Sequence, residues 1–540
     1  MSSDAKQVTR SATLAGASLW LFLFAAAVRL LLLPLATLDS ADSPARVFIG
    51  WLWSEAPYYI SAGGWGPLHY YLIGAAMKLW PDPVWSPAVL HILFGSLACV
   101  FCYQLALELF RSRRGALLAA LGFALYPLAI ATSLEAHPEP PCIALLLLGI
   151  RYLVRLSRPE GRLRDAVIAG LAITLASAIR YEMWMILPLL AAPLLPQWRK
   201  LFTFTAVAMI HPLAWMIGCA LRFGNPLYSL MWSDDYERKI MDHANENVLQ
   251  LIAHKGMELL HTTARGLSLP LAALVAASVV WMVLRRRREA LWLLAPAWLF
   301  ALLSVLGARG SIWYKPSYTL IFGATALPFL AGLFQSWRVE HWPLRRFVSG
   351  AAVLVAAIGL TMVEPLWRAV PHGGAVQAQG WGRFEQQQQT IDLLKLIDDG
   401  QPMGRSPLVL DFVGWWPTGL VTSRTRIHPG SLCTPSGTPV PVDEPATQRF
   451  LLEHREGTFV SYDKGKLTEK LEMQSADTGA LAGVTLQFSQ PRRLPWSGAD
   501  VPGGTGTVTV SKYRVIGEPA VRDTRPAQCA TPCPVSLCSI

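Results

Sequence analysis

The fold is decided by residues 14–38, which read LAGASLWLFLFAAAVRLLLLPLATL. A helix needs roughly 20 apolar residues to cross a bilayer, and this run is long enough. It lacks a small-residue cleavage site, so we interpret it as a retained first membrane helix and not as a signal peptide. The whole chain agrees, because 53% of its 540 residues are hydrophobic and only 15% are charged. The sequence therefore predicts a polytopic α-helical membrane protein.

Further apolar segments continue this pattern along the chain. The sequence predicts about eleven transmembrane helices, at 13–37, 86–109, 115–132, 140–157, 165–180, 183–197, 201–221, 267–284, 290–307, 316–335 and 347–364. The segment 66–80 is apolar but short, so we expect a helix lying at the membrane interface. Two longer connections, 38–85 and 222–266, would be outer loops, and the later half of the second has an amphipathic helical pattern.

Lys and Arg residues gather in alternate short loops of this arrangement, and the formal net charge is +11. The loops of one side contain Lys6, Arg10, Arg111, Arg113, Arg114, the arginines of 151–164, Arg199, Lys200, Arg285, Arg286, Arg287, Arg288, Arg338, Arg345 and Arg346. The positive-inside rule therefore predicts a cytoplasmic N-terminus, and an odd number of spans predicts an extracytoplasmic C-terminus. Orientation and contact with anionic lipid account for the basic excess, so no nucleic-acid partner is expected.

The C-terminal region differs in composition from the rest of the chain. We divide the protein into a membrane domain, residues 1–364, and an extracytoplasmic (periplasmic) domain, residues 365–540. The second begins with a Gly-rich link and continues with a helix pattern near 384–399 and a strand at 408–412. Strand patterns VTLQF and TVTVSKYRVI follow, so we expect a small α/β or α+β domain. Its cysteines could form two disulfides in any of three connectivities: Cys433, Cys529, Cys533 and Cys538.

Ionisable residues of both signs collect in the predicted outer loops, beside Trp and Tyr. They are Asp39, Asp42 and Arg46 after the first span, His69 in GPLHYYL, Glu135, His137 and Glu139 between spans three and four, Arg180, Tyr181 and Glu182 between spans five and six, and Arg309, Tyr314 and Lys315 between spans nine and ten. Such a mixture is typical of a site and not of an orientation signal. Simpler roles are also open: Asp42 and Glu139 could each begin a helix, and Arg180 could snorkel to the interface.

Several short motifs are similar to those of a known superfamily. They are Asp42 soon after the first span, GPLHYYL (66–72), SLEAHPE (133–139), IRYEMWMILP (179–188), FGNPLY (223–228) and WYKPSY (313–318). In this order the chain, over roughly residues 13–335, resembles the polyprenyl-phosphate-sugar-dependent glycosyltransferases of the GT-C superfamily. It is most similar to the branch of the protein mannosyltransferases and the lipid A aminoarabinose transferases.

The resemblance implies roles for particular residues. Asp42 would be the acidic residue of the first outer loop and the candidate catalytic base, with Asp39 as its neighbour. Glu139 would take the place of a second acidic residue, usually Asp in the family. Arg180 would take the place of a basic residue near the donor phosphate. This sequence departs from the family in having Asp-Ser where an Asp-Glu pair is usual after the first span.

The chemistry of such a transfer can be argued from the residue types. A sugar on a polyprenyl phosphate already has a good leaving group, so the reaction needs a base for the acceptor hydroxyl and cations for the departing phosphate. Asp42 fits the first need, and one displacement would invert the anomeric centre. The phosphate-binding candidates are Arg180, Arg309, Lys315 and Tyr314, and the substrate-binding candidates are His69, Arg46, Glu135, His137, Glu182 and Tyr181. No cofactor is required, although Asp42 and Glu139 could share a divalent metal.

We therefore expect an enzyme of the bacterial inner (plasma) membrane that moves a sugar from a polyprenyl-phosphate donor to a glycan, lipid or protein acceptor on the extracytoplasmic face. The alternative is a transporter or flippase for a lipid-linked substrate, carrying an extracytoplasmic domain. A transporter should have internal repeats and ionisable residues at mid-membrane. The sequence has no clear repeat, and its ionisable residues gather at the outer ends of the spans, which favours the enzyme.

Overall fold

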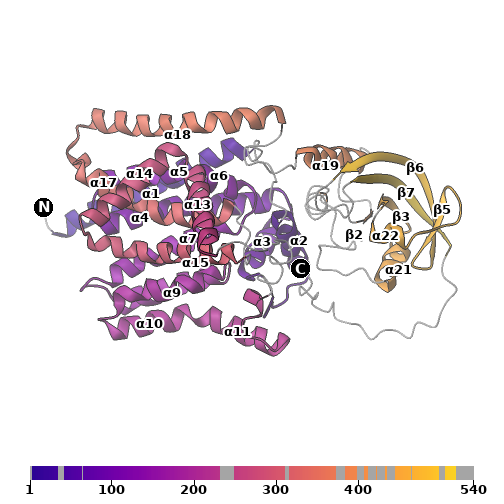
Figure 1. Ribbon diagram of the computed structural model, residues 1–540, viewed down its shortest axis with the longest axis horizontal. Helices are drawn as coiled ribbons and strands as arrows, with labels where there is room; N and C mark the ends of the chain where they lie inside the picture. Colours follow the sequence, from indigo (N-terminus) through magenta and orange to yellow (C-terminus); the bar gives the residue numbers. More distant parts are fainter. Residues whose placement is uncertain are drawn as a thin grey trace. The chain divides into compact units, whose positions relative to one another are not determined.

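The protein consists of a helical part and a part that contains a β-sheet (Figure 1). The computed structural model describes residues 3–33, 42–63, 65–231, 248–309, 316–372, 384–397, 407–411, 421, 432–433, 444–463, 465–497 and 505–517. Contacts divide the chain into two compact units: Met1–Ala36, Ile60–His69 and Ala88–Val370 form the first, and Thr37–Tyr59, Tyr70–Pro87 and Pro371–Ile540 form the second. The division at 364/365 that we expect from sequence remains a prediction.

The first unit is a bundle of helices. Its main elements are α1 (Ser3–Leu32), α4 (Trp85–Phe110), α5 (Arg113–Ala124), α6 (Pro127–Leu134), α7 (Glu139–Leu156), α8 (Leu163–Ser177), α9 (Glu182–Ala191), α10 (Trp198–Ala208), α11 (Ile210–Phe223), α13 (Val248–Leu267), α14 (Leu269–Leu284), α15 (Leu294–Ala308), α16 (Leu320–Ala326), α17 (Leu330–Ser336) and α18 (Leu344–His372). Each of the eleven predicted spans coincides with one of these helices or with a consecutive pair of them.

By length and composition, five helical segments among the described residues can cross a membrane, and eight can if each bent pair counts as one span. The bent pairs are α5–α6, α10–α11 and α13–α14, with angles of 51°, 43° and 117°. Pro127 opens α6 directly after the first break, where its missing N–H interrupts the helical hydrogen bonds. A multi-pass membrane protein is thus supported, and the number eleven remains a prediction.

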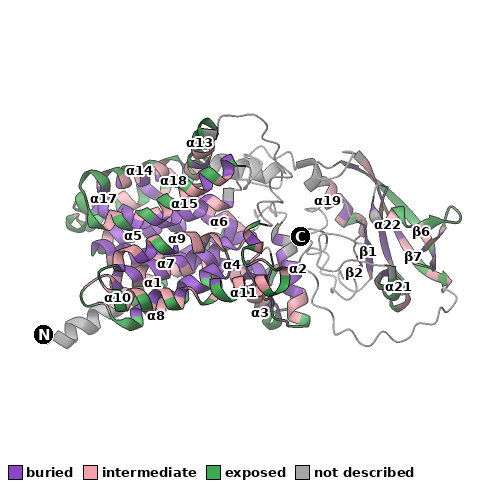
Figure 2. Cartoon of the chain, turned by 60° about the horizontal axis from the view of Figure 1, so that its bottom comes forward, coloured by how far each residue is buried: buried purple, intermediate pink, exposed green. Residues whose placement is uncertain are grey.

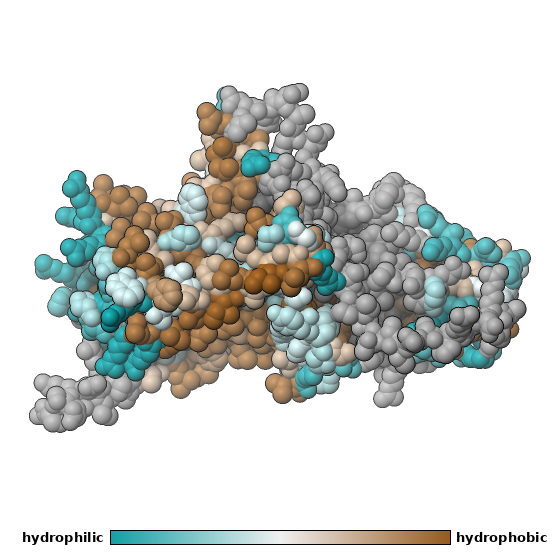
Figure 3. All heavy atoms as spheres, turned by 90° about the horizontal axis from the view of Figure 1, so that it is seen from below, coloured by the Kyte–Doolittle hydropathy of each residue, from teal (hydrophilic) through white to brown (hydrophobic). Residues whose placement is uncertain are grey.

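The surface of the bundle is apolar, as a lipid-facing surface must be. Buried residues fill its interior and exposed ones lie at its rim (Figure 2). Many exposed side chains are large and hydrophobic, among them Leu221 on α11 and Leu360 on α18. Figure 3 shows the corresponding brown band over the helical body, with hydrophilic residues gathered at the left end of the view. In water such a surface would drive aggregation, so it indicates a bilayer.

Loops that the charge pattern assigns to one side do meet at one end of the bundle. The hydroxyl of Ser112 and the backbone N–H of Arg114 both donate to the carboxylate of Glu340, at 2.8 and 2.7 Å. Arg158 forms an ion pair with Glu108 at 3.4 Å. Lys200 donates to the backbone oxygen of Leu156 at 3.0 Å. These contacts join four of the basic loops, as a common side of the membrane requires.

The second unit begins with two short helices in the predicted loop 38–85. They are α2 (Asp42–Glu55) and α3 (Leu68–Leu79), so the predicted helix at 66–80 is present. A methyl group at Gly50 would lie 2.6 Å from Ile73, and the rings of Trp53 and Tyr71 lie at a tilt with centroids 5.1 Å apart, so the two helices pack tightly. The helix start that we considered for Asp42 is confirmed.

The C-terminal region forms one mixed seven-stranded sheet in the order β2-β1-β3-β7-β6-β5-β4. The strands are β1 (Leu408–Leu410), β2 (Leu432–Cys433), β3 (Glu456–Tyr462), β4 (Glu472–Met473), β5 (Thr478–Leu481), β6 (Val484–Ser497) and β7 (Thr505–Gly517). The pairs β1–β2 and β1–β3 are parallel and the others are antiparallel. The predicted C-terminal α/β or α+β domain is therefore present as a sheet domain.

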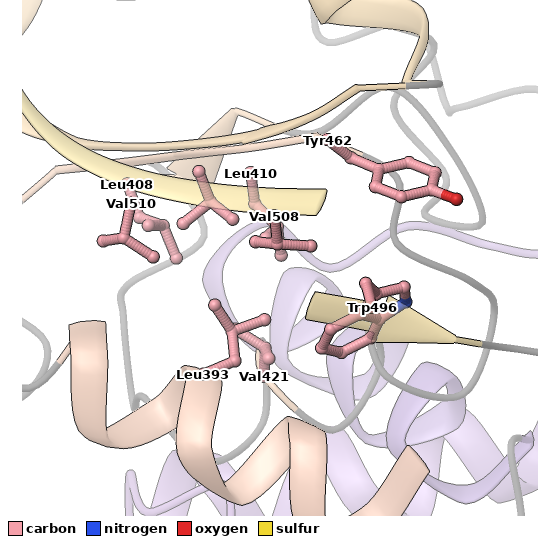
Figure 4. Close-up of a cluster of buried hydrophobic side chains, with 9 residues drawn as sticks. Leu393, Leu408, Leu410, Val421, Tyr462, Trp496, Val508 and Val510 are labelled. Atoms are coloured by element: carbon pink, nitrogen blue, oxygen red, sulfur yellow. The ribbon is translucent and has the colours of Figure 1, made fainter. Parts of the chain in front are cut away.

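Helices cover both faces of this sheet. On one face, Leu393 of α19 (Phe384–Ile397) packs against Val508 and Val510 of β7 and Trp496 of β6 (Figure 4). On the other face, Leu451 of α21 (Glu444–Glu453) lies in a second cluster. These two clusters give the domain its own hydrophobic core. Cys433 is buried in the second cluster, while Cys529, Cys533 and Cys538 lie outside the described residues.

Candidate active site

The turn between α6 and α7 carries three of the predicted site residues. Ala136 has a φ of 55°, a left-handed conformation that lets the chain reverse after α6. Pro140 and Pro141 then begin α7, with Glu139 as its first residue. Proline suits the first helical turn because the N–H groups there have no partner within the helix. The helix start that we considered for Glu139 is therefore confirmed, and the same turn brings Glu135, His137 and Glu139 together.

His137 lies between the two carboxylates of this turn. Its Nε2 is 3.1 Å from Glu135 Oε2, and its Nδ1 is 3.3 Å from Glu139 Oε2. The three side chains are largely buried, with exposed fractions of 6% for both glutamates and 13% for the histidine. The imidazole therefore meets a carboxylate at each ring nitrogen, an arrangement that favours its doubly protonated form.

The turn between α8 and α9 completes the cluster from a distant part of the sequence. Arg180 forms an ion pair with Glu139, and its Nε donates to Glu182 Oε2 at 3.3 Å. Its guanidinium also lies over the ring of Tyr318, 4.5 Å from the ring centroid. A buried Arg held by two carboxylates and an aromatic face is strongly oriented. Arg180 therefore does not snorkel, and it joins the loops at 135–139, 180–182 and 316–319.

The charges of the cluster shift the pKa values of its members. Burial alone would lower the pKa of His137, but hydrogen bonds and charge interactions with Glu135 and Glu139 outweigh it and raise the pKa to about 9. Burial would raise the pKa of Glu139, but the charge of Arg180 and then that of His137 hold it well below its usual range. The cluster thus brings three acidic side chains, those of Glu135, Glu139 and Glu182, together with the two basic side chains of His137 and Arg180.

The GPLHYYL segment lies against the same α8–α9 turn. The backbone N–H of Leu68 donates to the oxygen of Ala178 at 3.1 Å. A methyl group at Gly66 would lie 2.4 Å from that oxygen, so only glycine allows this close approach. His69 follows, and its Nε2 is 2.7 Å from Nε2 of His91 on α4. Both rings are fully buried, so His69 is part of the helix packing beside the cluster.

The other predicted site residues lie outside this cluster or outside the described residues. Arg46 is buried on α2. Tyr181 precedes α9, and its ring lies edge-on to that of Trp184. Arg309 is exposed just after α15. The structure does not describe Asp39, Tyr314, Lys315 or the side chain of Asp42, and their roles remain predictions.

The described residues of the cluster do not fit a divalent metal. The oxygens of Glu139 face Arg180 and His137, both cationic groups. Within the described part of the chain, no group of three or more His, Cys, Asp or Glu side chains could hold a metal ion. The divalent metal that Asp42 and Glu139 could share remains a prediction, because the side chain of Asp42 lies outside the described residues.

Two buried polar residues near the cluster are not among the site residues predicted from sequence. His91 lies within an apolar run, and Arg29 lies within the first span. Arg29 is fully buried, and its Nε donates to Ser133 Oγ on α6 at 3.2 Å. An arginine inside a membrane span is itself a signal of a special role, because exposing its charge to lipid costs several kcal/mol.

Comparisons with known proteins agree with the family resemblance that the sequence motifs indicate. Residues 65–219 match the family model described as dolichyl-phosphate-mannose-protein mannosyltransferase. No curated protein sequence gives a significant match. The structure resembles that of ArnT from Cupriavidus metallidurans bound to undecaprenyl phosphate, with a TM-score of 0.56, 14% identity, and coverage of 84% of this chain and 93% of that one. The apo form of the same protein gives a TM-score of 0.53 at 14% identity, with coverage of 84% and 93%.

A third similar structure is the apo oligosaccharyltransferase of Archaeoglobus fulgidus, with a TM-score of 0.42, 13% identity, and coverage of 83% of this chain and 70% of that one. At these identities, the likeness to ArnT establishes the fold. The matched segment 65–219 contains the whole of the turns at 135–139 and 180–182. Together, the family match and the fold confirm the predicted resemblance.

Proposed function

We propose that this chain is a glycosyltransferase of the GT-C superfamily, as its partial family match and its fold support, and that it transfers a sugar from a polyprenyl-phosphate donor to an acceptor hydroxyl on the extracytoplasmic face of a membrane. The observation that carries the proposal is the buried cluster of Glu135, His137, Glu139, Arg180 and Glu182, which lies wholly within the segment that matches the mannosyltransferase family. The ArnT structure that has a similar fold contains undecaprenyl phosphate, which supports a lipid-linked donor here.

In this proposal the catalytic base is Asp42, at the start of α2. Its carboxylate would take the proton of the acceptor hydroxyl while the sugar leaves the donor phosphate, in one displacement with inversion at the anomeric carbon. Asp39 would adjust the charge around the base. Glu139 is a poor base, because Arg180 and His137 stabilise its ionised form. We assign it to orienting the acceptor or the sugar.

The departing phosphate requires positive charge. Arg309, exposed at the end of α15, and Lys315 with Tyr314 are the candidates, because they belong to a loop that leads into the cluster at Tyr318. Arg180 carries the same predicted role. Its two carboxylate partners already neutralise it, so we propose that its main effect is to fix Glu139 and Glu182.

The side of the membrane follows from the charge pattern. The basic loops that meet at one end of the bundle would face the cytoplasm under the positive-inside rule. The cluster occupies turns that alternate with those loops along the chain, so it would face outward. The C-terminal sheet domain would then be extracytoplasmic, and a bacterial inner membrane fits the family resemblance.

The test uses the purified full-length chain in liposomes, with mannosyl-phospho-undecaprenol as the donor probe and membrane extract as the source of acceptor. Removing a catalytic base costs about 10²–10⁴-fold in rate, so we expect Asp42→Asn to lose at least about 10²-fold while it still binds undecaprenyl phosphate. The matched control is Asp82→Asn, which keeps the oxygen that accepts from Val84 N at 2.8 Å. Transfer by Asp42→Asn at the wild-type rate would exclude this base. Failure of the wild-type chain to bind undecaprenyl phosphate would exclude the enzyme class.

A further inference from the structure

Arg29 occupies an unusual position in the first membrane helix. It is fully buried, and it makes three hydrogen bonds to three different helices. Its Nε donates to Ser133 Oγ of α6 at 3.2 Å. Its Nη1 donates to the backbone oxygens of Ala25 in α1 at 3.1 Å and Ala124 at the end of α5 at 3.4 Å. Within the described residues these acceptors are all neutral, and Nη2 has no hydrogen-bond partner.

These acceptors lie on both sides of the break between α5 and α6. Ala124 is the last residue of α5, and Pro127 begins α6 after a bend of 51°. The last four carbonyl groups of a helix have no N–H partner within it, so the carbonyl oxygen of Ala124 is open to another donor. A guanidinium can bond such carbonyls at a helix C-terminus. Arg29 therefore bonds α5 before the break and α6 after it, and holds both against α1.

The surrounding helices leave room for this contact. A methyl group at Gly95 of α4 would lie 2.3 Å from Ser133 Oγ and 2.8 Å from Arg29 Nε. Both distances are shorter than Cβ atoms tolerate, so glycine at this position lets Arg29 and Ser133 meet. Ser133 Oγ in turn donates to Ala129 O at 2.6 Å. One guanidinium thus bonds α5 and α6 to α1, and α4 packs closely against the same contact at Gly95.

The end of α6 leads directly into the cluster. Ser133 lies two residues before Glu135, and α6 ends at Leu134. We propose that Arg29 is a positioning residue, which fixes the direction of α6 and thereby places the Glu135–His137–Glu139 turn against Arg180. Arg29 itself points back toward Ala25, along α1, so it acts through the helices and does not touch the substrate. The kinetic test of this inference rests on the proposed transferase function, whereas the structural role of Arg29 does not.

The kinetic test compares Arg29→Met with Arg29→Lys, which keeps the charge but not the forked geometry. Small displacements of a reacting geometry can cost about 10²-fold in rate, so we expect Arg29→Met to lower kcat at least about tenfold with the KM for the donor within about twofold. Arg29→Lys should recover part of that loss. The matched control is Arg158→Met, which removes a half-buried arginine and its contacts with Glu108 at the other end of the bundle.

A second measurement does not depend on activity. The rate at which diethyl pyrocarbonate modifies His137, followed by mass spectrometry, reports how well the turn is closed, while His254 on α13 is exposed and serves as the internal reference. We expect a rise of at least about threefold for Arg29→Met, because opening of a local structure exposes its groups to reagent. No rise is expected for Arg158→Met.

The outcomes separate the two proposals. Unchanged kcat and an unchanged rate of His137 modification in Arg29→Met would overturn the positioning role. A fall in kcat in Arg158→Met as large as that in Arg29→Met would also overturn it. If the wild-type chain transfers no sugar, the proposed function fails, and the modification rate alone decides the role of Arg29. If Arg29→Met does not fold, Ser133→Ala, which removes one acceptor, replaces it. A His137 modification rate equal to that of the wild type would then overturn the proposal.

Discussion

His137 should make the stability of the protein fall as the pH rises from about 6.5 to about 9. Its Nε2 and Nδ1 lie 3.1 and 3.3 Å from the carboxylates of Glu135 and Glu139, and these partners raise its pKa from 6.5 to about 9 against the effect of burial. A group whose folded-state pKa is raised binds its proton more tightly in the folded state. Its stabilisation is therefore complete below the unfolded value and is lost as the pH passes the folded value.

The magnitude follows from the same two values. One pKa unit corresponds to 1.36 kcal/mol, so the interval from 6.5 to about 9 amounts to about 3 kcal/mol. The side chain is 13% exposed, so solvent screening reduces this figure little. In His137→Gln the titrating group is absent, so this contribution to the free energy of unfolding should be absent at every pH.

The assay is denaturant unfolding of the purified chain in detergent between pH 6 and 10, followed by tryptophan fluorescence. The quantity of interest is the difference between the wild type and His137→Gln, because other groups titrate in both. That difference should shrink by about 3 kcal/mol between pH 6.5 and 9.5. The control is His254→Gln, which removes an exposed histidine of α13 and leaves the turn at 135–139 intact. A difference that stays constant with pH, or that grows, would refute the electrostatic account of the turn.

Three further outcomes are expected. Glu139→Gln and Arg180→Gln should each destabilise the protein by about 3–5 kcal/mol, because each leaves a buried charge unpaired. In a double-mutant cycle measured by thermal or chemical unfolding, the double variant should lose less free energy of unfolding than the two single variants together. Gly66→Ala should lower transfer activity in the liposome assay, because its methyl group would lie 2.4 Å from Ala178 O and push the segment off the α8–α9 turn. Asp411→Ala should destabilise the sheet domain by about 1–3 kcal/mol, measured by proteolysis of the intact chain, because its carboxylate accepts the two backbone N–H groups of residues 467 and 468.

Much of the helical framework can be predicted because hydrophobicity, proline and charge act locally. The start of α7 at Glu139-Pro140-Pro141 can be predicted because proline is favoured in the first turn of a helix. The loops rich in Lys and Arg can be assigned to one side of the membrane because of the positive-inside rule. The strands β6 and β7 follow from alternating apolar residues in VTLQF and TVTVSKYRVI. Their order in the sheet does not, because it is set by pairing between distant segments such as β3 and β7.

The candidate site is predictable only in its parts. The turns at 135–139 and 180–182 stand out by composition, but their ion pair depends on the packing of α7 against α8. Arg29 escaped because a single charge in a long apolar run changes its average hydropathy little. His91 escaped for the same reason. In both cases the buried partner, Ser133 or His69, lies on another helix.

The order of strands in the sheet has a consequence for biogenesis. The strand β7, which ends the described sequence, lies between β3 and β6 and pairs with both. Until residues 505–517 have been synthesised, β3 lacks one neighbour and the β6–β5–β4 portion is detached from the rest. The sheet can therefore close only once β7 is available for pairing, and a truncation before Thr505 should leave two sheet fragments with unpaired edges, which chaperones and proteases would recognise.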